Sequence, residues 1–136
     1  MSAKVTVVIP SFNRISYLTN ALESVFSQTY DDFEIVVIND GSTDPKYKSH
    51  KYLDKIHQID LETNQKLLNG FGPGNIRNFG NIKSNSKYIA FLDDDDIWMP
   101  NKLEEQINAL EKYNEKMVCS DAFIGEGIYN KSFNYK

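Results

Sequence analysis

Four consecutive aspartates, Asp93, Asp94, Asp95 and Asp96, are the side chains in this sequence with the clearest capacity for chemistry. Adjacent carboxylates repel one another, so at least one would have a raised pKa unless a cation were bound beside it. Carboxylate oxygens favour a hard divalent cation such as Mg²⁺, Mn²⁺ or Ca²⁺. Two carboxylates with phosphate oxygens and waters are the usual ligands at a Mg²⁺–nucleotide site. The acidic run therefore predicts a metal-assisted nucleotide site.

The same run has other interpretations. It could be a solvated turn that caps the helix predicted to begin at Pro100, whereas an EF-hand loop fits poorly because the required glycine and glutamate are not at the right spacing. If the segment is extended, Asp93 and Asp95 point to one side and Asp94 and Asp96 to the other.

Three further residues are suited to ligand binding. Asp40 ends an apolar segment and precedes Gly41, so it could accept a hydrogen bond from a base N–H or a ribose hydroxyl, although Asp-Gly is also a common turn pair. Arg77 lies near a predicted helix start, where it could contact a base edge or phosphate, or form a surface salt bridge. Trp98 is interpreted as a packing residue, with a sugar or base contact as the alternative.

The segments that must position these residues alternate between strand and helix patterns. Continuous or alternating apolar runs predict strands, and apolar residues at helical spacing predict helices. The predicted strands are 5–9, 33–38, 56–61, 88–92 and a short one at 117–119. The predicted helices are 16–28 with Ser16 as N-cap, part of 43–55, 74–83, and a segment with Pro100 at its first position. Residues 62–73 are predicted to be a loop, and 125–136 show no clear periodicity.

This alternation predicts an α/β fold with an open, mainly parallel, twisted sheet flanked by helices. Ligands of such sheets bind beyond the carboxyl ends of the strands. Polar segments follow three predicted strands, at residues 10–14, 39–42 and 93–96. We therefore expect these three segments to converge on one site at a single edge of the sheet.

Composition narrows the classes of function. The 136 residues suit a single domain, and 40% hydrophobic content excludes disorder as the main state. No basic block suggests nucleic-acid binding, and no apolar run approaches the ~18 residues of a transmembrane helix. The start resembles a strand and not a signal peptide, and one cysteine, Cys119, predicted to be a buried thiol, fits a reducing compartment. We expect a cytoplasmic protein, with membrane association left open.

Five sequence blocks together resemble the family 2 glycosyltransferases. They are VTVVIPSFNR, the amphipathic segment ending in SQTY, FEIVVINDGSTD, GPGNIRNFG and YIAFLDDDDIWMPNKLE. They span residues 4–120 in the family's order, which is more specific than one DxD motif. The resemblance implies a GT-A fold and transfer of a sugar from a nucleotide-sugar donor, usually with inversion. It also implies a divalent metal, Mn²⁺ or Mg²⁺.

The resemblance also implies roles for individual residues. The loop that wraps the nucleoside corresponds to Pro10, Ser11, Phe12, Asn13 and Arg14. Asp40 corresponds to the acid that contacts the base, most often uracil, and Arg77 to the arginine near base and phosphate. In the DxD motif Asp95 resembles the direct metal ligand, and Asp93 or Asp94 faces the ribose or the waters of the metal. Asp96 and Trp98 match the family's D-D-x-W ending near the donor sugar.

Full enzymes of this family continue into an acceptor-binding half that carries the general base. Residues 1–136 are therefore expected to form one donor-binding domain without that half, and no base is recognisable, Asp121 being the first candidate. The alternative is a non-catalytic nucleotide-sugar-binding module or a donor domain that needs a partner. A sugar-nucleotide pyrophosphorylase fits less well because the first loop is not glycine-rich. Uncovered strand edges and the apolar tail suggest a homodimer. The acceptor, whether glycan, lipid or protein, is not specified.

Overall fold

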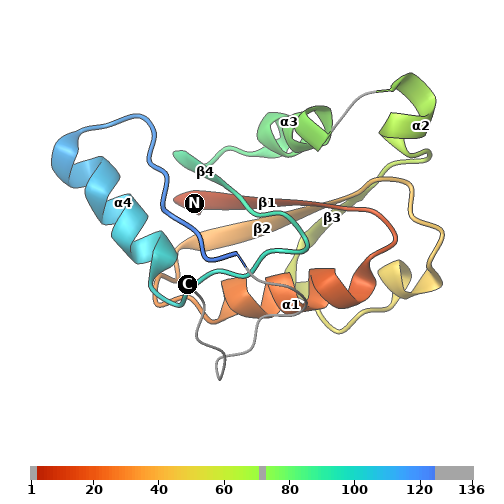
Figure 1. Cartoon of the computed structure of the whole chain (residues 1–136), viewed down its shortest axis with the longest axis horizontal. Coiled ribbons are helices and arrows are strands. Elements are labelled where there is room, and N and C mark those ends of the chain that lie inside the picture. The colour runs from red at the N-terminus through yellow and green to blue at the C-terminus, as the bar shows by residue number, and fades with distance from the viewer. Residues whose placement is uncertain (1–2, 71–72, 125–136) are drawn as a thin grey trace.

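The computed structural model describes residues 3–70 and 73–124, which form a four-stranded parallel sheet with helices on both faces (Figure 1). The strand order is β3-β2-β1-β4. The strands are β1 (Val5–Ser11), β2 (Phe33–Asn39), β3 (His57–Asp60) and β4 (Tyr88–Phe91). The helices are α1 (Ile15–Phe26), α2 (Gln65–Asn69), α3 (Pro73–Lys83) and α4 (Lys102–Tyr113), with 3₁₀ helices η1 (Pro45–Lys48) and η2 (Leu53–Lys55). The predicted α/β fold with a parallel sheet is confirmed.

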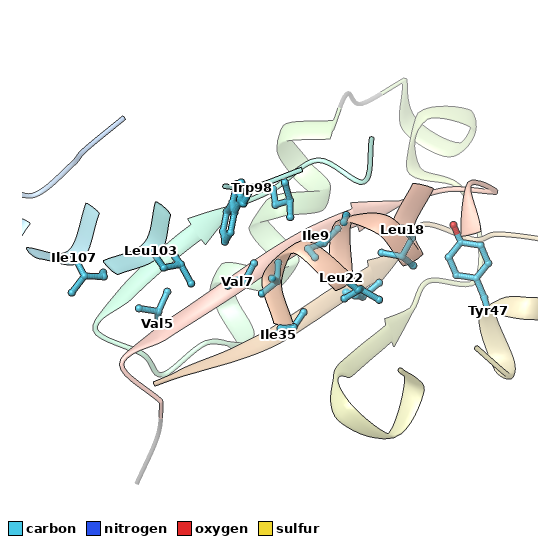
Figure 2. Packing of buried hydrophobic residues seen from close by; sticks show 14 of the residues in the cluster. Val5, Val7, Ile9, Leu18, Leu22, Ile35, Tyr47, Trp98, Leu103 and Ile107 are labelled. Carbon is cyan, nitrogen blue, oxygen red and sulfur yellow. The ribbon is translucent and has the colours of Figure 1, made fainter. Parts of the chain in front are cut away.

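The central strands are apolar on both faces because each face is covered. On one face, Val5, Val7 and Ile9 of β1 belong to a cluster that includes Leu18 and Leu22 of α1, together with residues of α4 (Figure 2). On the other face, a smaller cluster lies beneath α3 and contains Val8, Val36, Ile38 and Ile76. Burial on both sides explains why β1 and β2 read as continuous apolar runs in the sequence.

Helix α4 buries the stripe predicted for it, namely Leu103, Ile107 and Leu110. It begins two residues later than predicted, with Asn101 as the N-cap. The Pro100 carbonyl accepts a hydrogen bond from Thr29 N at 2.8 Å, so Pro100 belongs to the preceding turn. Helix α1, by contrast, begins earlier than predicted. The Arg14 carbonyl accepts from Leu18 N at 3.0 Å, which makes Arg14 and not Ser16 the N-cap.

Several other local predictions are wrong. Residues 43–55 form two 3₁₀ helices, and the predicted loop at 62–73 contains α2, because Asn64 accepts from Leu67 N and caps a helical turn. Residues 117–119 form no strand. Within this segment Val118 packs against the core and Met117 is exposed. Cys119 is consequently exposed, and not the buried thiol that was predicted.

Strand β4 is an edge of the described sheet, with Ile89 and Phe91 exposed. This matches the uncovered edge from which a homodimer was predicted, and the dimer stays a prediction. The apolar residues of the tail at 125–136 lie outside the described residues. Among residues 3–70 and 73–124, no helix is both long enough and apolar enough to cross a bilayer.

The contact between α3 and β1 generates a stability prediction. A Cβ at Gly80 would overlap both γ-methyl groups of Val8, a core side chain without room to move. Gly80→Ala should lower the free energy of unfolding by ~1–3 kcal/mol, as expected for overpacking. Gly74→Ala is the matched control in the same helix, because a Cβ there meets no atom within 4 Å. It should leave stability unchanged or raise it by up to ~1 kcal/mol. Urea unfolding of both variants tests this, and equal stabilities would contradict the packing argument.

Candidate functional site

The register of the sheet brings three polar loops to one edge. Ser11, the last residue of β1, is level with Asn39, the last residue of β2. Val8 is level with Phe91, the last residue of β4, so the aspartates that follow β4 lie at the edge of the sheet where β1 and β2 also end. The predicted convergence of residues 10–14, 39–42 and 93–96 is therefore present in the structure.

Asn13 connects the first of these loops to the second. It has a positive φ of 52°, in the left-handed region that Asn tolerates better than most residues. Its side-chain oxygen accepts from Thr43 N at 2.9 Å and Asp44 N at 3.2 Å, and its main-chain N–H donates to Ser42 Oγ at 2.9 Å. These bonds fix the loop after β1 against the loop after β2.

Arg14 connects the same loop to the aspartates. Its guanidinium lies 2.6 Å from Asp94 Oδ1 and 2.8 Å from Asp95 Oδ2. The Asp94 side chain is 0% exposed, whereas those of Asp95 and Arg14 are about half exposed. Burial raises the pKa of Asp94, opposed by the Ser11 hydroxyl and the Arg14 guanidinium. Arg14 therefore supplies positive charge to a carboxylate that is cut off from water.

The aspartates lie in a turn and not on an extended segment. Asp96 N donates to Asp93 O at 3.1 Å, which turns the chain directly after β4. The alternation of side-chain directions expected for an extended segment is therefore absent here. Asp94 and Asp95 both contact Arg14, and Asp93 forms an ion pair with Arg77 of α3. Arg77 is thereby placed at the site, with its Nε buried and lacking a hydrogen bond among the described residues.

Tyr47 is a component that the sequence analysis missed. It is 1% exposed, and its hydroxyl lies 2.5 Å from Ser11 Oγ and accepts from Arg14 N at 3.0 Å. The buried Tyr47 hydroxyl thus holds the loop after β1, which carries Arg14, in place. The only sequence signal was an aromatic residue within an otherwise polar stretch.

Asp40 lies at the same edge but has different neighbours. Its carboxylate accepts from Gln65 N at 2.9 Å and from Asn64 Nδ2 at 2.8 Å. Burial raises the pKa of Asp40, opposed by the N–H of Gln65. Gly41 has φ 70°, and a Cβ there would collide with the backbone of Thr63 and Asn64, so glycine permits this close approach. Asn64 was also missed by the sequence analysis.

A cavity of about 500 Å³ extends from the aspartates toward α4. Asp95, Asp96 and Trp98 line it on one side, and Asp121 lines it from the segment after α4. Trp98 is 8% exposed and belongs to the main apolar cluster, which supports its interpretation as a packing residue. A larger cavity, about 780 Å³, lies along β3 and includes none of the four aspartates.

The residues at this edge are chemically suited to a hard divalent cation that is shared with a ligand. Asp93 and Asp95 are accessible, and neither oxygen of buried Asp94 has a hydrogen bond of ordinary geometry within the described residues. No group of three acidic, histidine or cysteine side chains in residues 3–70 and 73–124 is placed to hold a metal unaided. A bound ion would therefore need oxygen ligands from a substrate, as Mg²⁺ commonly does.

Comparison with known proteins gives consistent matches. The sequence profile of glycosyl transferase family 2 matches residues 6–131. An uncharacterized glycosyltransferase of Rickettsia bellii is 44% identical over 112 residues, which are 82% of this chain and 16% of that protein. The UDP-Glc:alpha-D-GlcNAc-diphosphoundecaprenol beta-1,3-glucosyltransferase WfgD of Escherichia coli is 36% identical, across 96% of this chain and 53% of that protein.

Among solved structures, S. aureus TarS 1–349 in complex with UDP-GlcNAc superposes with a TM-score of 0.71 and 29% identity. The match covers 82% of this chain and 32% of that one. The GT-A fold implied by the sequence resemblance is thereby confirmed. The chain spans between about a sixth and about a half of the length of these proteins.

Lys102 generates a prediction about the cavity. Its ammonium lies 4.1 Å from the centre of the Trp98 ring and donates to Gln106 at 2.6 Å, and burial lowers the pKa of Lys102 to about 8. Because the unfolded chain has the ordinary value of 10.5, it binds this proton more often than the folded chain between pH 8 and 10.5. The contribution of Lys102 to the free energy of unfolding should therefore rise with pH across that interval.

Urea unfolding of wild type and Lys102→Met at several pH values measures this contribution. Emission of Trp98, the single tryptophan of the chain, gives a local readout that should titrate near pH 8 in wild type alone. The same stability difference at pH 7 and pH 10 would show that Lys102 keeps its ordinary pKa.

Proposed function

The chain belongs to glycosyl transferase family 2, and on this premise we propose that it forms the donor-binding part of a metal-dependent sugar transferase. The donor is a nucleotide-sugar, with a UDP-sugar as the class that we favour. The observation that carries this proposal is the convergence of three strand-end loops, in which Arg14 joins the loop after β1 to Asp94 and Asp95. Arginine and aspartate side chains thus lie at the edge where parallel sheets bind nucleotides, which supports the proposal.

The preference for UDP has two supports. Asp40 directly follows β2 and has a buried carboxylate, an acceptor suited to the N3–H of uracil. In addition, the E. coli relative is named for a UDP-Glc donor, and TarS was solved with UDP-GlcNAc. We propose that the nucleoside lies along residues 10–14, and that Arg77 contacts the base or the phosphates.

Asp95 is the proposed direct ligand of a Mn²⁺ or Mg²⁺ ion, with Asp93 contributing directly or through water. When bound, such an ion would supply positive charge to the leaving diphosphate. Arg14 and Arg77 now pair with these carboxylates. We propose that both guanidinium groups transfer part of their contacts to the phosphates, since arginine suits phosphate as well as carboxylate geometry. Asp96 and Trp98 would adjoin the donor sugar at the cavity.

An inverting transfer also needs a base to take the proton of the acceptor hydroxyl. Asp121 lines the cavity that contains Asp95 and Asp96 and remains the first candidate within the described residues. The alternative, a non-catalytic nucleotide-sugar-binding module, has less support because the matched relatives are named as glycosyltransferases.

The first test concerns the metal. UDP should bind the wild-type chain about tenfold (~1.4 kcal/mol) more tightly with Mn²⁺ than with EDTA, because a bound ion would add positive charge that favours the diphosphate. Asp95→Ala should abolish this difference, whereas Asp54→Ala, a change of an exposed aspartate in η2, should preserve it. Isothermal calorimetry measures the affinities. Equal responses of Asp95→Ala and wild type to Mn²⁺ would remove Asp95 from the metal site.

The second test concerns the base. Asp40→Ala should weaken UDP binding by ~1.5–3 kcal/mol, the contribution of a hydrogen bond to a charged group. The gain from Mn²⁺ should persist in this variant because Asp40 does not contact the ion. Unchanged UDP affinity would assign Asp40 a purely structural role in the turn.

A further inference from the structure

We infer that Asn64 is a positioning residue for nucleobase recognition, which holds the Asp40 carboxylate in the orientation that selects a pyrimidine with a ring N3–H donor. This inference rests on the proposed function, in which Asp40 contacts the base. Asn64 lies outside every motif that the sequence analysis used.

The first support is the contact itself. Asn64 Nδ2 donates to Asp40 Oδ2 at 2.8 Å, and the Asp40 main-chain oxygen lies 3.3 Å from the same nitrogen. Gln65 N donates to the other carboxylate oxygen at 2.9 Å. Within residues 3–70 and 73–124, each oxygen thus accepts from one donor and keeps acceptor capacity for a ligand. Two donors on the same segment prevent the carboxylate from rotating freely.

The second support is that the orientation of Asn64 is itself determined. Its Oδ1 accepts from Leu67 N at 3.1 Å as the N-cap of α2. A main-chain N–H can only donate, so the acceptor end of the amide must face α2 and the donor end must face Asp40. Both residues are under a tenth exposed, which shields their contact from competing water. Gly41 allows the approach, because any Cβ there would strike the backbone at Asn64.

The third support is chemical. An ionised carboxylate only accepts hydrogen bonds, so it suits the N3–H of uracil and repels the N3 lone pair of cytosine. Burial raises the pKa of Asp40, and the N–H of Gln65 acts against that rise. Without the Asn64 donor, the orientation of the carboxylate would be less fixed. The discrimination between uracil and cytosine should then decrease.

The test separates the donor role of Asn64 from its capping role. Asn64→Ser retains a good N-cap acceptor and removes the amide donor. Asn64→Asp keeps both size and cap, and places an oxygen where the donor was. Binding of UDP and CDP to the full chain with Mn²⁺ is measured by calorimetry, with circular dichroism confirming the fold of each variant. Asn78→Ser, at an exposed position of α3, is the matched control.

We expect Asn64→Ser to raise the Kd for UDP about tenfold, within the range for one hydrogen bond to a charged group. The Kd for CDP should change less than twofold, so that the preference for UDP over CDP decreases. Asn64→Asp should decrease this preference further, and Asn78→Ser should leave it unchanged. In an Asp40→Ala background, Asn64→Ser should have almost no effect on UDP, because it acts through Asp40.

Two outcomes would overturn the inference while the proposed function stands. One is that the Asn64 variants weaken UDP and CDP by the same factor, as a general loss of structure would. The other is that the effects of Asp40→Ala and Asn64→Ser on UDP affinity add. A wild-type chain that binds neither nucleotide with Mn²⁺ would overturn the proposed function, and this inference with it.

Discussion

Four adjacent carboxylates at the end of one strand impose a charge balance on the rest of this molecule. The aspartates after β4 are acceptable in the folded chain because two arginines, from different segments, supply opposite charge. Arg14 comes from the loop after β1, and Arg77 comes from α3. Much of the surrounding structure serves to deliver these two guanidinium groups. Asn13 adopts a left-handed conformation to fix the first loop, and Tyr47 is buried beneath it.

The same balance bears on the proposed binding of an anionic ligand and a cation. Arg14 pairs with Asp94 and Asp95, and Arg77 pairs with Asp93, so three of the four aspartates have a cationic partner within the chain. A diphosphate with a divalent ion would offer each group a partner of opposite charge: phosphates for the arginines and a cation for the carboxylates. The energetic difference between the two states is then an exchange of partners and not the creation of new buried charge.

The sequence predicted those helices and strands in which burial follows a regular pattern along the whole element. Strands β1 and β2 are buried on both faces, and α4 buries one stripe, so their patterns are visible locally. The convergence of three loops also followed from sequence, since parallel strands place their ends at one edge. The predictions failed where a distant residue decides the outcome. The turn at Asp93 reorients the carboxylates, and the burial of Tyr47 depends on Ser11, 36 positions away. Asn64 could not be recognised because its partner Asp40 lies 24 positions earlier, in the loop after β2.

The position of β1 at the centre of the sheet also determines when the site can exist during folding. Val5 is level with Phe33 of β2 and with Tyr88 of β4. The pairing of β1 with β4 must therefore close a far longer loop than the pairing of β1 with β2. The contact between Arg14 and Asp95 spans 81 positions. Because long loops close later and more slowly than short ones, β4 should dock after β1 and β2 have paired. On the ribosome, the pairing of β1 with β2 could therefore precede the synthesis of the acidic turn, whereas the contacts of Arg14 with Asp94 and Asp95 could form only afterwards.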